Sequence, residues 1–193
     1  MCLLLAHLAH AVLPLTTLSD EQAGNISALS AIRVLEDKTG SLLVDNALPQ
    51  LSNTGETHYG KVSLGYSGST YWAGFSVSAP QGSQYFLELG NPFIDEFELW
   101  VYVRGQLALH RSSGDLLPFS AREQSYPNFL LPLPEFGHAA QDVVLRIRSG
   151  SNLSLPIMLV PEPMKAGLLS RYWSKSGLIF GALLIIGLFR LAK

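Results

Sequence analysis

Apolar and polar residues alternate along most of the chain between residues 31 and 160. Successive side chains of a β-strand point to opposite faces, so this alternation predicts strands with one buried face. The apolar positions of the four clearest runs are Ala73, Phe75, Val77 and Ala79; Phe97, Leu99, Val101 and Val103; Val143, Leu145 and Ile147; and Leu155, Ile157 and Leu159. No long amphipathic helix and no internal repeat is evident in this part of the sequence.

Turn-forming residues separate the alternating runs. Clusters of Gly, Pro, Asn, Asp and Ser occur at residues 37–40, 66–69, 79–82, 90–92, 104–105, 113–115 and 149–152. About nine short strands separated by such turns predict an all-β domain, either a β-sandwich or a jelly roll. We assign this domain to residues 30–163.

Charge is low and unevenly distributed. Charged residues make up 15% of the 193 residues and the formal net charge is −2, which argues against a generally basic nucleic-acid-binding protein. Residues 19–163 hold 15 acidic and 8 basic groups, whereas residues 164–193 hold five basic groups and no acidic one. An acidic body followed by a basic, apolar tail is typical of a domain attached to a membrane. Cys2 is the only cysteine, so thiol chemistry and disulfides are excluded from the body.

The first eleven residues are expected to be the end of a cleaved export signal. An apolar run leads into Ala9-His10-Ala11, which has the small-x-small pattern of a signal-peptidase site. No Lys or Arg precedes the run, as expected if the start of this chain lies downstream of the true start. The alternative is an apolar first strand or helix of the fold.

Residues 172–191 predict a C-terminal membrane helix. The stretch is 20 residues long and begins with the aromatic pair Tyr172-Trp173, which suits the outer membrane interface. Its uncharged part, residues 177–189, is only 13 residues long, so we expect the helix to continue beyond this chain. Residues 164–171 would form a short basic connector. The alternative is a helix buried in a protein core.

The run over residues 95–104 carries the most informative polar face. Opposite its core positions, polar and aromatic residues follow one another in steps of about 7 Å, namely Glu96, Glu98, Trp100, Tyr102 and Arg104. Sugar-binding sheets use this mixture, because aromatic rings pack on pyranose C–H groups while carboxylates and guanidinium groups bind hydroxyls. The alternative is cross-strand pairing on an exposed face.

Residues from other runs extend this face. Trp72 is out of phase with the core positions of its own run, and Arg146 and Arg148 lie opposite the core positions of theirs. Arg122 follows a turn and would either join the face or form a buried ion pair with Glu88, Glu96 or Glu98. The complete set of expected ligand-binding residues is Trp72, Glu96, Glu98, Trp100, Tyr102, Arg122, Arg146 and Arg148.

Catalytic and metal-binding signatures are weak, so we expect a binding domain without cofactor or metal rather than an enzyme. His58, His110 and His138 are far apart, lack metal-ligand spacing and are expected in surface loops. Residues 37–40 could offer oxygens to calcium, but they do not match an EF-hand loop and predict a turn. A sandwich-fold glycoside hydrolase remains an alternative, using two of the carboxylates Glu88, Glu96 and Glu98.

Six motifs occur in a characteristic order, at residues 32–42, 71–75, 86–101, 114–122, 144–149 and 153–157. Together they resemble the extracellular sensor domain, second type, of bacterial seven-transmembrane receptors with diverse intracellular signalling modules. The resemblance covers about residues 30–190. It implies a periplasmic jelly roll similar to carbohydrate-binding modules, held at the inner membrane and followed by seven helices and a cytoplasmic output domain, which this chain does not contain.

The resemblance implies a sensor that binds a ligand in the periplasm and signals through the membrane. A glycan or a small polar molecule is the expected ligand, since the family offers no single ligand to transfer. The alternative is an interaction module that binds another receptor domain or a second copy of itself, with its out-facing Trp and Tyr residues at the interface.

Overall fold

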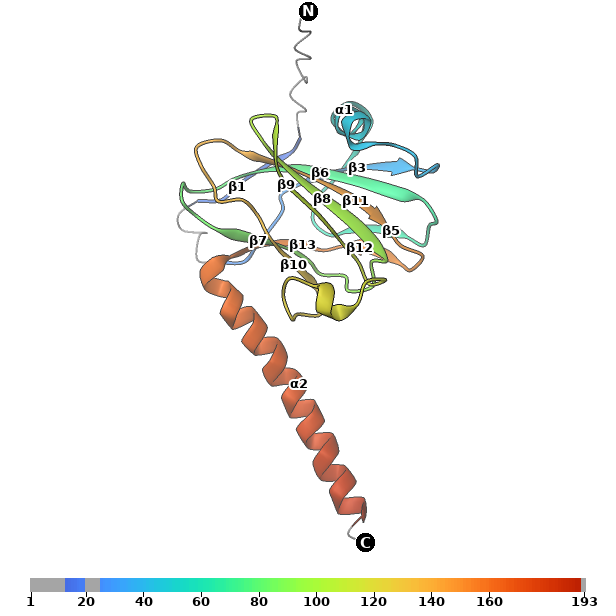
Figure 1. The fold of residues 1–193 in the computed structure, drawn as a ribbon, viewed down its shortest axis with the longest axis vertical. Coiled ribbons are helices and arrows are strands. Elements are labelled where there is room, and N and C mark those ends of the chain that lie inside the picture. Colours follow the sequence, from blue (N-terminus) through green and yellow to red (C-terminus); the bar gives the residue numbers. More distant parts are fainter. Residues whose placement is uncertain (1–12, 20–24, 192–193) are drawn as a thin grey trace, which may run out of the picture.

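The larger of two stacked sheets has seven strands and forms one layer of a β-sandwich in the computed structural model, which describes residues 13–19 and 25–191 (Figure 1). Six strands follow the order β4-β3-β6-β11-β8-β9, and β1 pairs in parallel with β6. The strands are β1 (Leu15–Thr17), β3 (Ile32–Asp37), β4 (Glu56–His58), β6 (Thr70–Ser78), β8 (Glu96–Val103), β9 (Gln106–Ser113) and β11 (Gln141–Arg148).

The second layer is an antiparallel four-stranded sheet in the order β10-β7-β13-β2. Its strands are β2 (Ser27–Ala28), β7 (Tyr85–Leu89), β10 (Phe129–Pro132) and β13 (Ile157–Pro161). The strands β5 (Val62–Gly65) and β12 (Leu153–Leu155) pair separately as a two-stranded ribbon. The predicted β-sandwich is therefore confirmed.

The main core lies between the two layers, and the predicted core positions supply it. Phe75, Leu99 and Leu145 of the larger sheet are each 0% exposed. They belong to one cluster with apolar residues of the smaller sheet, including Leu87 and Leu159. The last predicted run is divided into β12 and β13 at Pro156, which has no N–H for a ladder hydrogen bond.

The outer face of the larger sheet brings the predicted polar positions into register. Arg146 of β11 lies between Trp72 of β6 and Glu98 of β8. Two residues away on β11, and on the same face, Val144 lies between Gly74 and Trp100.

Helix α1 (Val44–Thr54) covers part of this outer face, and the strand pattern does not predict it. Its residues Ala47 and Leu51 are buried against Trp72 in a second core. A Cβ on Gly74 would meet a side-chain atom of Leu51 at 3.2 Å, so glycine at this position lets the helix approach the sheet. Trp72, expected to contact a ligand on this face, is therefore covered by α1.

Helix α2 (Glu162–Leu191) follows β13 without a loop. Residues 164–171, expected as a short basic connector, are the first part of this helix. They pack on the outer face of the smaller sheet through a third apolar cluster formed by Phe86, Tyr126, Leu130 and Val160 with Ile26, Met164, Leu168 and Leu169. Figure 1 shows that the rest of α2 projects away from the sandwich.

The prediction that residues 172–191 form a membrane span does not hold for this helix. Across the described ranges, none of the helices combines the length and the hydropathy required to cross a membrane. The uncharged run at residues 177–189 would rise about 20 Å as a helix, against a hydrocarbon thickness of about 30 Å. The expected signal segment, residues 1–11, lies outside the described residues and stays a prediction.

Candidate functional site

Three aromatic rings stack on the outer face of the larger sheet. Trp100 lies between Trp72 and His110, with ring-centroid distances of 5.5 and 4.9 Å. Trp72 and Trp100 are only 1% and 8% exposed, because they belong to the core beneath α1. These two indole rings therefore stabilise the position of α1 and do not present a free stacking surface.

Tyr102 lies beside the same core and is half-buried. Burial raises the pKa of its phenol, and the negative charge of Asp45 on α1 raises it further. Tyr102 is therefore a neutral hydrogen-bonding group at neutral pH, next to the covered part of the face.

The carboxylate of Glu98 contacts two basic side chains, Arg146 and His110. Arg146 Nη1 donates to Glu98 Oε1 at 3.1 Å, and His110 Nε2 lies 3.3 Å from Glu98 Oε2. Arg146 Nη2 also donates to the carbonyl oxygen of Gly40 at 3.3 Å. Both carboxylate oxygens of Glu98 are thus engaged, and the pair ties β8 and β11 to the loop that precedes α1.

That loop is organised by Asp37. Its carboxylate accepts hydrogen bonds from the N–H groups of Thr39, Gly40 and Leu42 and from the Thr39 hydroxyl. Burial is the largest single influence and would raise the pKa of Asp37, but these hydrogen bonds together outweigh it and lower the pKa below its ordinary value of 3.8. The predicted turn at residues 37–40 is confirmed.

The lowered pKa makes the contribution of Asp37 to stability dependent on pH. A depressed folded-state pKa stabilises the fold above the unfolded pKa, and the stabilisation is lost as the pH falls through the folded value. We expect Asp37→Asn to lower the free energy of unfolding by about 1–3 kcal/mol at pH 7. The difference in free energy of unfolding between the wild type and this variant should become smaller below about pH 4. Urea unfolding at pH 7 and pH 3 measures this. Glu56→Gln is the control at an exposed carboxylate. An equal loss of unfolding free energy in Asp37→Asn at both pH values would contradict a lowered pKa of Asp37.

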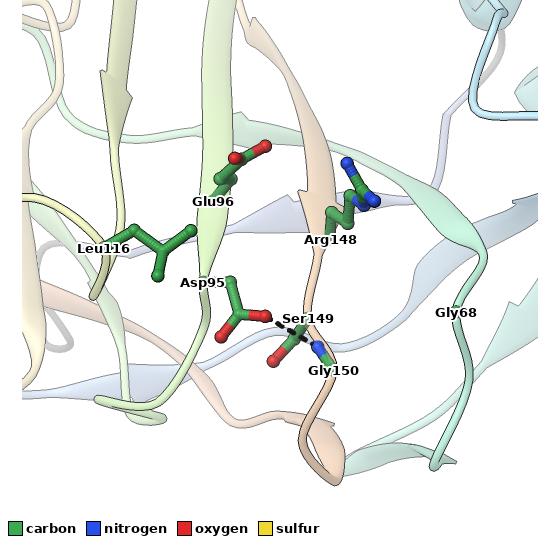
Figure 2. A pocket seen from close by; sticks show the side chains of 7 residues that line it. All are labelled: Gly68, Asp95, Glu96, Leu116, Arg148, Ser149 and Gly150. Atoms are coloured by element: carbon green, nitrogen blue, oxygen red, sulfur yellow. Dashed lines mark hydrogen bonds between the residues drawn. The ribbon is translucent and has the colours of Figure 1, made fainter.

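Two adjoining pockets open at the end of the outer face that α1 leaves uncovered. The first has a volume of 290 Å³ (Figure 2) and is lined by Gly68, Asp95, Glu96, Leu116, Arg148, Ser149 and Gly150. The second has a volume of 390 Å³, shares Asp95, Glu96 and Leu116 with the first, and extends to Glu98, Ser112, Leu117 and Arg146. We call the combined depression the β8–β11 groove. Four of the eight expected ligand-binding residues line it: Glu96, Glu98, Arg146 and Arg148.

The groove contains one free pair of opposite charges. Glu96 and Arg148 face each other in the register of β8 and β11, are both exposed, and form no ion pair or hydrogen bond with any described residue. Figure 2 shows the two side chains projecting to the same side of the sheet. Asp95 is differently placed, because its Oδ2 accepts the N–H of Gly150 at 2.7 Å and holds the turn after β11.

Arg122 does not join this face. Its Nη2 lies 3.4 Å from Asp115 Oδ1, and its Nη1 donates to the carbonyl oxygens of Tyr126 and Pro127. The expected ion pair with a glutamate is wrong, because this arginine lies in the 114–128 segment, which connects β9 to β10.

Glu88 is also separate from the groove. It lies on β7 of the smaller sheet, where it accepts hydrogen bonds from Tyr126 Oη at 2.9 Å and Asn128 Nδ2 at 2.7 Å. Two of the three carboxylate pairs considered for a hydrolase contain Glu88, and the fold places their members on different sheets. The third pair, Glu96 and Glu98, shares β8.

The histidines show what the sequence analysis missed. His58 and His110 lie on β4 and β9 and not in loops. His110 belongs to the aromatic stack, and its partner could have been found from the hairpin register that sets it opposite Trp100. Within residues 13–19 and 25–191, no three His, Cys, Asp or Glu side chains are grouped so as to hold a metal ion.

Comparison with solved structures gives a β-sandwich carbohydrate-binding module, from a study of promiscuous specificity in these modules, at 11% sequence identity and a TM-score of 0.28. The match covers 72% of this chain and 55% of that one, so the chain spans about half the length of the module structure. None of the curated proteins compared with the chain matches it. Residues 30–161 match the family described as 7TMR-DISM extracellular 2, which is more than half of the chain. The chain therefore belongs to the 7TMR-DISM extracellular 2 family, the extracellular sensor domains of seven-transmembrane receptors.

Proposed function

We propose that this chain is the periplasmic ligand-sensing domain of an inner-membrane signalling receptor, with a binding rather than a catalytic role, and that its ligand binds in the β8–β11 groove. Family membership supports the receptor role. The free charge pair Glu96 and Arg148 supports this location. The neighbouring pair Glu98–Arg146 is joined by a salt bridge, whereas Glu96 and Arg148 keep unused hydrogen-bonding capacity.

The lining of the groove suits a glycan or a small polar molecule. A hydroxyl group can donate to the carboxylate of Glu96 and accept from the guanidinium of Arg148, and hydrogen bonds to charged groups are stronger than neutral ones. Leu116 and Leu117 are 70% and 47% exposed and give the same groove an apolar wall. A sugar presents both kinds of surface, since its hydroxyls surround patches of C–H groups.

The experiment is a glycan array on the purified chain, followed by calorimetry with each ligand that binds. We expect Glu96→Gln and Arg148→Met each to raise the dissociation constant about tenfold or more, because a hydrogen bond to a charged group contributes about 1.5–3 kcal/mol. The exposed residues Glu135 and Lys61 lie outside the groove, and Glu135→Gln and Lys61→Met are the matched controls. Binding that is unchanged in both groove variants would move the site away from this face.

A further inference from the structure

The first residues of the 114–128 segment border the β8–β11 groove. Leu116 and Leu117 line the groove, and the N–H groups of Asp115 and Leu116 donate to the carbonyl oxygens of Ile94 and Asp95 at 2.8 and 3.3 Å. Asp95 lines both pockets of the groove. The start of the segment is therefore one wall of the groove and is held to the chain just before β8.

The end of the same segment reaches α2. Tyr126 is 6% exposed, donates its hydroxyl to Glu88 and packs edge-on against the ring of Tyr172, with centroids 5.7 Å apart. Tyr126 also belongs to the apolar cluster that holds the first turns of α2. In Figure 1 the segment, drawn in yellow, lies on the side of the sandwich from which α2 projects.

Arg122 joins the two ends of the segment. Its guanidinium contacts Asp115 next to the groove and the carbonyl oxygens of Tyr126 and Pro127 next to α2. The same group lies over the Phe129 ring, 4.4 Å from the centroid. The side chain is 9% exposed, and such a buried, planar group has several fixed donors and cannot move without displacing its partners.

We propose that the 114–128 segment carries the state of the β8–β11 groove to α2, with Arg122 as the positioning residue. The inference rests on the proposed function in that the groove is the site where the signal binds. A ligand that contacts Leu116 and Leu117 displaces the start of the segment. The side chain of Arg122 then moves with Asp115, to which it is bound. Because Arg122 also holds the carbonyl oxygens of Tyr126 and Pro127, the contact between Tyr126 and Tyr172 changes. Packed contacts of this kind respond in discrete steps and not by continuous deformation.

The test fills the groove without a ligand. Gly68 lies on the groove wall opposite the segment (Figure 2), and a Cβ built on it meets nothing within 4 Å, so Gly68→Trp adds a large side chain to this wall without a clash at its base. Gly137→Trp is the matched control, because Gly137 is equally open and lines a different pocket, beside Arg104 and His138. Hydrogen exchange followed by mass spectrometry on the purified chain reads out peptides from residues 114–128 and 164–172. Circular dichroism checks that each variant is folded. If Gly68→Trp does not fold, Gly68→Phe is used in its place.

We expect Gly68→Trp to change the exchange rate of residues 164–172 by about threefold or more, which is well resolved for a local opening equilibrium, while Gly137→Trp leaves it unchanged. In an Arg122→Met background, Gly68→Trp should alter only residues 114–120 and no longer α2. A purely structural Arg122 would shift the baseline without removing this response. Unchanged exchange of α2 in Gly68→Trp, or a response that persists without Arg122, would overturn the proposal.

The two failures are distinguishable. Exchange is measured without ligand, whereas the proposed function is tested by ligand binding to groove variants. If the domain binds a glycan in the groove but Gly68→Trp leaves the exchange of α2 unchanged, the proposed function holds and the coupling is refuted. If Gly68→Trp changes the exchange of α2 but no glycan binds in the groove, the coupling holds and the proposed ligand site is refuted.

Discussion

Replacing Trp72 with Ala is expected to lower the free energy of unfolding by about 3–5 kcal/mol, the range for removing a large buried aromatic side chain. Trp72 is 1% exposed, stacks on Trp100 and packs against Leu51 of α1. Its loss leaves a cavity beneath α1 that the surrounding residues fill only in part. Denaturant unfolding measures the effect, with the midpoint and the slope determined separately.

Two further variants make this expectation specific. Phe93→Ala removes a side chain that is 66% exposed and should cost much less. Trp72→Phe keeps most of the ring while removing a buried indole N–H that has no hydrogen-bond partner among the described residues, so it should cost less than Trp72→Ala. A Trp72→Ala loss below about 1 kcal/mol would mean that α1 does not cover the sheet in solution.

Replacing Gly114 with Ala is the second large effect, with an expected cost of about 3 kcal/mol, at the upper end of the usual range for overpacking. An added Cβ would lie 2.0 Å from the carbonyl oxygen of Asp95, which is rigid backbone and cannot rotate away. The 114–128 segment must then separate from the chain before β8, so the wall of the β8–β11 groove is lost as well.

Gly105→Ala is the control that separates this clash from backbone strain. Gly105 has φ of +73° but a Cβ there meets no atom within 4 Å, so only the left-handed conformation is penalised, by about 1–2 kcal/mol. Thermal and denaturant unfolding of the two variants gives the comparison. Equal costs for Gly114→Ala and Gly105→Ala would contradict the close approach of the segment to Asp95.

The strand faces were predictable because alternation is a local property of extended backbone. Phe75, Leu99 and Leu145 are buried where the pattern places them, and Arg146 and Glu98 are in register on the opposite face. Helix α1 was not predicted. Val44, Ala47, Leu48 and Leu51 do have helical spacing, but Pro49 lies among them and usually ends a helix.

The candidate site was predictable only in part, because its open and closed portions depend on distant segments. Glu96 and Glu98 are equivalent in the sequence pattern, yet Glu98 meets His110 of β9 and an arginine that is fixed by Gly40. The aromatic residues were expected to contact a ligand, but α1 covers Trp72. Arg122 was assigned to the wrong partners because the path of a long connection is set by tertiary packing and not by local pattern.

The direct junction of β13 and α2 has a mechanical consequence. No flexible residues separate Pro161 at the end of the strand from Glu162 at the start of the helix, so the two elements rotate together. A helix of 30 residues is about 45 Å long, and a tilt of about 5° at its base would displace its far end by about 4 Å. Tyr172 lies about a third of the way along α2, so a shift of about 1 Å where it meets Tyr126 is amplified about threefold at the far end of a stiff helix, whereas a flexible linker would absorb it.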